Sequence, residues 1–377
     1  MKIVKLSEVC EVLDSKRIPV TANNRKKGIY PYYGANGIQD YVSDYIFDDE
    51  LVLLAEDGGN FGSKDKPIAY RVSGKCWVNN HAHVLKPRDN INVDYLCDAL
   101  KFYDVTNIIN GATRKKLTQA AMLGMQIPLP DLDKQNKISL ELKTCTTIIE
   151  KHRKLISKYD TLIKSRFIEM FGDPVQNPMK WEIKPMGELL SLLTDFSSNG
   201  SYKTLDSNVI MYDEPNYALM IRTTDLESGD FSNNVKWVDE KAYNLLSKSK
   251  VFGKEIIMNK IGSAGKVYLM PELNRPVTLG RNAFLFRYKE NINSVYIYFL
   301  LTSEYGQNEI KPYIRGAVTK TITKDDARKI RIPVPPITLQ NKFENFVQQI
   351  DKSKFAVQKS LEKAETLYKS LMQEYFG

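Results

Sequence analysis

The chain has 377 residues, of which 42% are hydrophobic and 26% charged, and its 54 Lys and Arg residues outnumber 45 Asp and Glu residues, giving a net charge of +9. This length allows two or three hydrophobic cores, and no uncharged apolar run is long enough to predict a membrane span. The positive charge favours an anionic partner without identifying it.

The N-terminus and the cysteines indicate a compartment. The first five residues include two lysines and lack the apolar core of a signal peptide. Cys10, Cys76, Cys97 and Cys145 form no CxxC pair, a distribution typical of reduced thiols rather than of disulfides or a zinc site. We therefore expect a cytoplasmic protein with no metal site.

Residues 1–132 have the pattern of a mixed α/β globule. Residues 49–55 and 83–86 are short apolar runs that predict strands, and both are followed by turn-forming residues. Residues 95–100 have the apolar spacing of a helix. We expect this first globule to be an independent domain.

Residues 133–171 predict one long helix, which Gly172 and Pro174 end before a linker over residues 172–182. Apolar residues recur alternately every four and three positions, as in a coiled coil. We call these positions the seam; polar residues interrupt it at His152, Arg166 and Lys354. The seam comprises Ile138, Leu142, Cys145, Ile149, Ile156, Tyr159 and Ile163 and, in a second helix, Phe343, Val347, Ile350, Val357, Leu361, Tyr368 and Leu371.

The second half of the chain repeats the first. The octapeptide that starts at Gly111 returns at Gly316, an offset of 316 − 111 = 205 residues, and Ile-Pro-x-Pro returns in the same register, at residues 127–130 and 332–335. Residues 183–337 again predict a mixed globule, with strands at 254–258 and 283–286 and a helix at 295–300, and residues 338–377 predict a second long helix. Since the second globule starts where the first helix ends, the two helices are expected to pair antiparallel. The fold class is therefore α+β: two similar mixed α/β globules joined by an antiparallel two-helix coiled coil, with internal pseudo-twofold symmetry.

Motifs of catalysis are weak in this sequence. Residues 262–266 (Gly-Ser-Ala-Gly-Lys) have the wrong spacing for a phosphate-binding loop, so we interpret them as a turn. Asp131 with Glu141 and Lys143 has the outline of a nuclease motif, but Glu141 and Lys143 flank seam residue Leu142 and are better explained as the solvated flanks of a helix. We expect a chain that is not itself an enzyme and binds no cofactor.

The globules instead offer cationic, amide and hydroxyl groups on turns, which are the groups that read base edges and hold phosphates. In the first half the candidates are Arg25, Lys26, Tyr32, Tyr33, Asn36, Asn60, Lys64, Asn79, Asn80, His81, Arg114 and Lys115. In the second half they are Arg222, Thr223, Lys260, Ser263, Lys266, Arg281, Asn282, Arg315 and Lys320. For each residue taken singly, an ordinary surface or turn group is the simpler explanation; the set is better supported than its members.

The repeated glycine octapeptide, the Ile-Pro-x-Pro segment, the glutamine that follows it and the long helix together resemble the specificity subunit of type I restriction–modification systems. Residues 78–82, 171–174 and 221–226 also look like that family. The resemblance implies two target-recognition domains, each reading one half of a bipartite, asymmetric site in double-stranded DNA. It also implies a helical spacer that docks two modification (methyltransferase) subunits, in a complex that includes restriction (translocase/nuclease) subunits.

In such complexes adenine methylation from S-adenosylmethionine and DNA cleavage driven by ATP with Mg belong to the partner subunits, so this chain would carry no cofactor. The alternative is a coiled-coil scaffold with two protein-interaction domains that binds no DNA. An autonomous nuclease or methyltransferase is a more distant third hypothesis.

Overall fold

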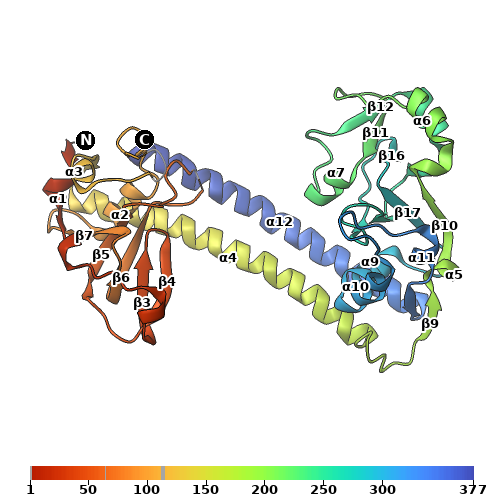
Figure 1. Cartoon of the computed structure of the whole chain (residues 1–377), viewed down its shortest axis with the longest axis horizontal. Coiled ribbons are helices and arrows are strands. Elements are labelled where there is room, and N and C mark those ends of the chain that lie inside the picture. Colours follow the sequence, from red (N-terminus) through yellow and green to blue (C-terminus); the bar gives the residue numbers. More distant parts are fainter. Residues whose placement is uncertain (1, 64, 112–114) are drawn as a thin grey trace. The chain divides into compact units, whose positions relative to one another are not determined.

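The computed structural model describes residues 2–63, 65–111 and 115–377 and divides into two compact units. Unit 1 comprises Met1–Lys154 and Gln358–Gly377, and unit 2 comprises Leu155–Val357. Two 40-residue helices, α4 (Leu132–Phe171) and α12 (Ile337–Phe376), contribute residues to both units (Figure 1). Within the described ranges, no helix combines the length and apolar character needed to cross a membrane.

Unit 1 is built on a six-stranded sheet, one side of which is covered by α2 (Val93–Lys101) (Figure 1). The central strand β5 is buried from Leu51 to Ala55; its Val52, Leu54 and Ala55 share a core with α2, and Leu51 and Leu53 belong to a second cluster. In sheet order the strands are β2 (Cys10–Val12), β7 (Ala82–Pro87), β5 (Phe47–Ala55), β6 (Ala69–Val78), β3 (Lys27–Gly34) and β4 (Gly37–Val42). A separate strand pair is formed by β1 (Lys2–Lys5) and β8 (Gln126–Leu129). Unit 1 also contains the short helices α1 (Leu6–Val9) and α3 (Gln119–Leu123) and the 3-10 turns η1 (Asp14–Lys16) and η2 (Ala22–Asn24).

Unit 2 contains two four-stranded sheets and one strand pair. The first sheet has the order β10 (Leu190–Asp195), β17 (Ala283–Tyr288), β14 (Ile256–Asn259) and β15 (Val267–Leu269). The second has the order β12 (Lys236–Val238), β11 (Ala218–Ile221), β16 (Val277–Leu279) and β13 (Lys250–Val251), and β18 (Arg331–Val334) pairs with β9 (Glu182–Pro185). The helices are α5 (Met186–Leu189), α6 (Tyr202–Asn208), α7 (Thr223–Ser228), α8 (Glu240–Leu245), α9 (Ser294–Thr302), α10 (Glu304–Ile310) and α11 (Lys324–Arg328), with 3-10 turns η3 (Phe196–Asn199), η4 (Ser247–Ser249) and η5 (Lys311–Tyr313).

The two units share a frame and differ in what is added to it. The antiparallel order β2-β7-β5-β6 of unit 1 is the order β10-β17-β14-β15 of unit 2, and the pair β1-β8 corresponds to β9-β18. Unit 1 extends this sheet with β3 and β4, whereas unit 2 carries a separate sheet between β10 and β17 in the chain. The duplication is therefore confirmed in the frame, and the additions account for the divergence of the sequences outside it.

Within each unit, α4 and α12 pack antiparallel. In unit 1, Glu141 accepts a 2.6 Å hydrogen bond from the Tyr375 hydroxyl, and Arg153 forms a 2.6 Å ion pair with Glu365. In unit 2, Lys354 pairs with Asp160 over 2.5 Å. Residue numbers fall along α12 as they rise along α4, which confirms the antiparallel pairing and the α+β class. It also leaves Glu141, the carboxylate of the nuclease outline, bonded across the helix pair.

Seam residues differ in burial. The buried ones are Ile138, Leu142, Cys145, Ile149, Ile163, Phe343, Val347 and Leu361; of these, Ile138 and Leu142 belong to the core of unit 1, and Ile163, Phe343 and Val347 to a core of unit 2. Those that remain partly exposed are Ile156, Tyr159, Ile350, Val357, Tyr368 and Leu371. Beyond Ile163 the buried positions of α4 are Phe167 and Phe171, because this end of the helix packs against Tyr296 of α9, with the Phe167 and Tyr296 rings stacked at 5.7 Å.

Candidate nucleic-acid interface

Most candidate residues of unit 2 gather around the turn between β14 and β15. This turn runs from Lys260 through Ser263 to Lys266, and its glycines have left-handed φ angles of +82° at Gly262 and +85° at Gly265. Glycine adopts such angles without the steric cost that a side chain would incur. The Gly-Ser-Ala-Gly-Lys segment is thus a hairpin turn, as the sequence predicted.

Two further segments adjoin this turn. The backbone N–H of Lys260 donates to the carbonyl of Asn282 over 2.9 Å, which brings the β16–β17 connection beside it. Residues 315–321, which we call the glycine loop, are closed by reciprocal backbone bonds between Arg315 and Thr321, and the N–H of Gly262 donates to the carbonyl of Lys320 over 3.0 Å. The structure thereby brings together Lys260, Ser263, Lys266, Asn282, Arg315 and Lys320.

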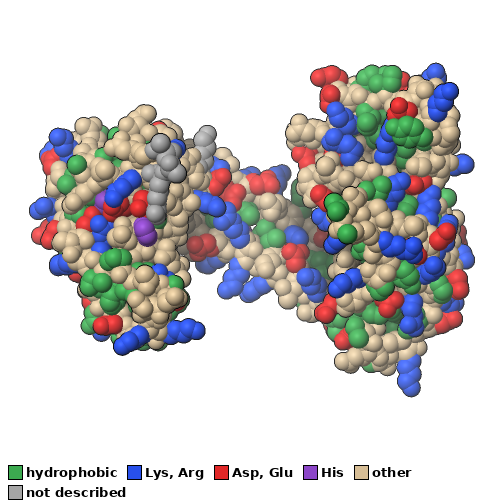
Figure 2. Space-filling model, viewed as in Figure 1, with side chains coloured by type: hydrophobic (Ala, Val, Ile, Leu, Met, Phe, Trp, Pro, Cys, Tyr) green, Lys and Arg blue, Asp and Glu red, His purple; other side chains and the backbone are tan. Residues whose placement is uncertain are grey.

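Several cations in this unit already have carboxylate partners. Arg222, beside Thr223 at the start of α7, forms a 2.7 Å ion pair with Asp225. Arg281 is 3.1 Å from Asp206, Lys266 is 3.4 Å from Glu227, and Arg315 is 3.0 Å from Asp326. These partners offset part of each charge, although exposed ion pairs of this kind contribute little to stability. Figure 2 shows Lys and Arg side chains interspersed with acidic ones on the visible face of this unit.

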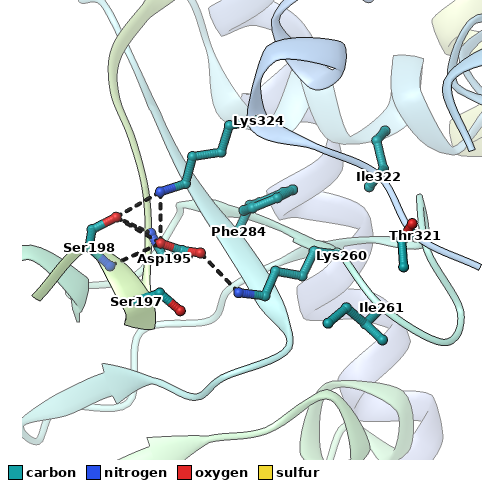
Figure 3. A pocket seen from close by; sticks show the side chains of 9 residues that line it. All are labelled: Asp195, Ser197, Ser198, Lys260, Ile261, Phe284, Thr321, Ile322 and Lys324. Carbon is teal, nitrogen blue, oxygen red and sulfur yellow. Dashed lines mark hydrogen bonds and ion pairs between the residues drawn. The ribbon is translucent and has the colours of Figure 1, made fainter. Parts of the chain in front are cut away.

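A cavity of about 530 Å³ opens beside the β14–β15 turn, and we call it the Asp195 pocket (Figure 3). Asp195 ends β10 and accepts a 2.9 Å bond from Lys260 and a 2.7 Å bond from Lys324. Ser198 donates to the same carboxylate through both its backbone N–H (3.1 Å) and its hydroxyl (2.7 Å). The other lining residues are Ser197, Ile261, Phe284, Thr321 and Ile322.

The electrostatics of this pocket follow from the Asp195 carboxylate. Burial alone would raise the pKa of Asp195, but hydrogen bonds from Lys324, Ser198 and Lys260 outweigh burial and lower the pKa to about 2. Asp195 is therefore ionised at neutral pH. Two ammonium groups around one carboxylate leave the cluster with a net charge of about +1.

The corresponding place in unit 1 is filled by an ion network, which we call the Arg17 network: Asp14, Arg17, Glu56, His83 and Lys116. Arg17 bonds to Glu56 over 2.5 Å and to the carbonyl of Ala82 over 2.7 Å. Lys116 reaches Glu56 over 2.8 Å. On the visible face of unit 1, Figure 2 shows histidine side chains among acidic and basic ones.

Three members of this network, Asp14, Glu56 and His83, place potential metal-ligating atoms within 4.8 Å of one another. His83 has the orientation of a metal ligand, since Nε2 lies 2.9 Å from the carbonyl of Leu117 while Nδ1 lies 2.6 Å from Asp14. The two carboxylates, however, are already neutralised by Arg17 and Lys116. Burial would raise the pKa of Glu56, but hydrogen bonds from Lys116 and Arg17 and the charge of His83 hold it below the ordinary value. We therefore assign the cluster to an ion network rather than to a metal centre.

The amide candidates of unit 1 lie close to that network. Asn36 donates to the carbonyl of Gly58 over 2.9 Å, and Asn79 accepts a 2.8 Å bond from the backbone N–H of His81. His81 in turn lies 2.6 Å from Asp57. Asn79 is only 3% exposed, so its amide shapes the β6–β7 turn, whereas Asn80 beside it is exposed.

The remaining described candidates of unit 1 are divided between two regions. Asn60 donates weakly, over 3.4 Å, to the carbonyl of Pro67, and Lys115 is exposed in the repeated glycine segment. Arg25 and Lys26 precede β3, and the Arg25 guanidinium stacks 4.1 Å above the ring of Tyr32. Lys64 and Arg114 lie outside the described residues.

Two tyrosine candidates lie inside the sheet. Tyr32 is 1% exposed, and its hydroxyl lies 3.0 Å from the backbone N–H of Val20. Tyr33 is half-buried and stacks on Tyr70 of β6 with ring centroids 5.8 Å apart. Tyr32 thus packs in the fold of unit 1, and only Tyr33 keeps part of its surface exposed.

Sequence reasoning missed the aspartates at the centre of both sites. Asp14 follows β2 and Asp195 ends β10, so they occupy the same place in the shared frame. Their offset is 195 − 14 = 181 residues instead of the 205 of the glycine octapeptide. The available signal was an aspartate at or just after the end of the second strand of each half, found by aligning strands rather than by applying one fixed offset.

Comparisons with known proteins agree on one family. The family model for the type I restriction modification DNA specificity domain matches residues 1–158 and 178–365. A putative type I restriction enzyme specificity subunit of Haemophilus influenzae is 38% identical over 143 residues, which cover 38% of this chain and 37% of that relative. The type I restriction enzyme MjaVIII specificity subunit of Methanocaldococcus jannaschii is 20% identical over 404 residues, covering 98% of this chain and 91% of the relative. The chain thus spans little more than a third of the first relative and most of the second.

Solved structures show the same fold. The S subunit of a type I restriction–modification system from M. genitalium superposes with a TM-score of 0.66 at 13% identity, covering 100% of this chain and 96% of that one. A chain from a study of complex assembly and conformational transition in a type I system superposes with a TM-score of 0.54 at 15% identity, covering 100% and 97%. At these identities the likeness concerns the fold alone.

Proposed function

Because the chain belongs to the type I restriction modification DNA specificity domain family, we propose that it is the DNA sequence-specificity subunit of a type I restriction–modification complex. The observation that carries this proposal is the family match in both halves of a chain whose two units share one frame. Cationic and amide side chains lie on the turns of that frame, and these are the groups that contact phosphates and base edges. A scaffold that binds no DNA is not favoured by this match.

In finer detail, we propose that each unit reads one half of a bipartite site in double-stranded DNA. The frame recurs in both units, while the additions to it differ. A shared frame with different additions suits two readers of different sequences. The paired helices α4 and α12 would then set the number of unread base pairs between the two half-sites.

We also propose partners that supply the chemistry. Two modification subunits would dock on the helical pair and methylate adenine with S-adenosylmethionine, and restriction subunits would cleave DNA with ATP and Mg. This chain would select the site and catalyse no step. The specificity subunits among its relatives support this division of labour by their names.

The test is the pattern of methylated adenines in a host that carries the partner genes. Genomic DNA would be sequenced for modified bases with the gene intact, deleted and restored. We expect one bipartite motif to lose methylation on deletion and regain it on restoration. An unchanged pattern, with the chain and the partner subunits present at normal levels, would contradict the proposed function.

A further inference from the structure

The Asp195 carboxylate is fully engaged by its neighbours. Its two oxygens accept bonds from Lys260, from Lys324 and from the N–H and hydroxyl of Ser198, and its side chain is only 8% exposed. A carboxylate so occupied has little capacity left to accept a bond from a nucleobase. Its effect is instead to fix two ammonium groups at the mouth of one cavity (Figure 3).

The two ammonium groups retain donors. A lysine ammonium has three N–H donors. In the contacts among the described residues, Lys260 uses one of them, on Asp195, and Lys324 uses two, on Asp195 and Ser198. The remaining donors come from two side chains that converge on the two oxygens of one carboxylate. That arrangement suits a ligand with several closely spaced acceptor oxygens.

Charge narrows the ligand further. The lysine side chains are 14% and 27% exposed, so solvent screens them less than it screens an exposed pair. Two ammonium groups and one carboxylate leave about one unit of positive charge. A phosphodiester carries one negative charge and two non-bridging oxygens, and it matches this cluster in both respects.

The wall of the pocket includes three apolar residues. Ile261, Ile322 and Phe284 line it; Ile261 is 41% exposed, whereas Phe284 and Ile322 are buried, at 3% and 4%. The cavity of about 530 Å³ lies within the size range of small-molecule sites and can admit one nucleotide unit. A deoxyribose lying on the exposed side chain of Ile261 would place its phosphate at the lysines.

The same place in unit 1 lacks this chemistry. Glu56 follows β5 where Lys260 follows β14, and the isolated bridges Asp57–Lys116 and Ile261–Thr321 mark the equivalence. In unit 1, Glu56 forms ion pairs with Arg17 and Lys116, and Asp14 also pairs with Arg17. The two carboxylates together offset the two positive charges. An open cationic pocket in one unit thus corresponds to a neutralised network in the other.

We propose that the Asp195 pocket binds one backbone phosphate of the DNA target, with Lys260 and Lys324 as donors, Asp195 as the residue that positions them and the deoxyribose lying on Ile261. This inference rests on the proposed function and deepens it. It assigns the pocket to holding the DNA in register rather than to reading its sequence, because phosphate contacts carry no direct sequence information.

The test is the salt dependence of DNA binding by the full chain. Binding of a target duplex and of an unrelated duplex would be measured by fluorescence anisotropy over a series of salt concentrations, for the wild type and for K260Q/K324Q. Neutralising one phosphate contact lowers the slope of log K against log salt by about 0.9. We expect the magnitude of this slope to fall by about 0.9 for the double variant on both duplexes. The affinity should decrease by the same factor on each duplex.

Two controls separate charge from folding. K289Q removes one charge at the opposite end of β17, where Lys289 donates to the carbonyl of Glu188 over 2.7 Å, and it should keep the wild-type slope. K260R/K324R retains both charges and should restore most of the slope. Thermal unfolding of every variant shows whether the fold is intact. If K260Q/K324Q is unfolded, the wild type is instead assayed on duplexes that each carry one neutral methylphosphonate. For one of these duplexes the slope of log K against log salt must then fall by the same amount.

Other outcomes would overturn the assignment. A folded K260Q/K324Q with the wild-type slope rejects the phosphate contact, and a loss confined to the target duplex shows that the lysines read a base edge. If inorganic phosphate raises the melting temperature through these lysines while the DNA slope is unchanged, the pocket serves a free anion. If the wild type, assayed together with its modification subunits, binds no duplex at low salt, the proposed function itself fails, which is a different result.

Discussion

The side-chain oxygen of Gln340 accepts a 2.8 Å hydrogen bond from the backbone N–H of Asn293, 47 positions earlier in the chain. Gln340 is fully buried near the start of α12, and its Nε2 donates to the carbonyl of Pro335 over 2.7 Å. Asn293 is the N-cap of α9. One amide therefore joins the first turn of the long helix to the N-terminus of a helix in the core of unit 2. Unit 1 has the same arrangement, with Gln135 Oε1 2.8 Å from the N–H of Asn92.

Replacing Gln340 by Ala should destabilise unit 2 by about 2–3 kcal/mol, because a buried N–H and a buried carbonyl lose their partners. Urea unfolding followed by circular dichroism measures the change. Gln348 lies on the exposed side of α12 and, among the described residues, bonds through its side chain to Glu344 alone, so Gln348→Ala is the matched control and should cost under about 0.5 kcal/mol. Equal effects of the two substitutions would show that the buried amide has no special role.

Asp195→Asn should lower the free energy of unfolding by about 2 kcal/mol at pH 7, since the pKa of Asp195 falls from 3.8 to about 2 in the folded chain. A depressed pKa stabilises the fold above the unfolded value and loses its effect as the pH falls towards the folded value. The difference between wild type and variant should stay constant from pH 7 to about 5 and narrow between about 4 and 2.

Urea titrations at several pH values follow that difference. The exposed aspartate Asp325, whose one ion pair within the described part of the chain is with Arg328, provides Asp325→Asn as a control with little expected effect at any pH. The difference in free energy of unfolding between wild type and Asp195→Asn could instead stay constant down to the pH at which the wild type unfolds. That result would contradict the ionised Asp195 carboxylate as its cause.

Arg17→Met should destabilise unit 1 by about 3 kcal/mol, because Asp14 and Glu56 would lose a cation while remaining largely buried. Lys16→Met, one residue earlier at an exposed position, is the control. Since we assign this cluster to an ion network, a chelator should leave the melting temperature of the wild type unchanged. A rise in melting temperature on adding zinc or manganese ions, abolished by Asp14→Asn, would instead establish a metal site.

Gly316→Ala should disrupt the glycine loop. Gly316 has φ of +99°, and an added Cβ would meet the carbonyl oxygen of Thr319 at 2.1 Å, which only a backbone shift relieves. Gly262→Ala shares the left-handed φ, at +82°, but its Cβ would meet nothing within 4 Å. We expect a cost of about 1 kcal/mol for Gly262→Ala from backbone strain and a larger loss, together with weaker DNA binding, for Gly316→Ala. Thermal unfolding compares the stability of the two variants, and fluorescence anisotropy compares their DNA binding. Equal losses of stability would show that the backbone relieves the Cβ clash at Gly316 without a further cost.

The fixed offset of 205 residues predicted much of the frame. The octapeptide at Gly111 and Gly316, the strands after it and both long helices recur in one register, because the chain between them has the same length in both copies. Asp14 and Asp195 were not found in this way, since the segments added to the frame differ in length. The additions themselves, β3 with β4 in unit 1 and a separate sheet in unit 2, have no common pattern from which either could be inferred.

Local sequence patterns also did not determine which of several neighbouring side chains are buried. The sequence predicts Tyr32 and Tyr33 as hydroxyl groups on turns, but Tyr32 is buried in the core and Tyr33 stacks on Tyr70, which lies on a strand far along the chain. In α4, heptad spacing beyond Ile163 indicates Arg166, whereas Phe167 is the buried residue. Heptad spacing predicts the buried positions only where α4 packs against another helix along its whole length. At its C-terminal end α4 packs instead against the core of unit 2, so a different position is buried.

Unit 1 is assembled from two distant stretches of chain, and Tyr368, Leu371, Tyr375 and Phe376 pack on the core formed by its first 142 residues. During synthesis on the ribosome, every residue of unit 2 emerges before Gln358–Gly377. The order of completion is therefore the reverse of the order of translation: the second unit can finish folding while the first still waits, with one side of its core uncovered, for the last twenty residues of the chain.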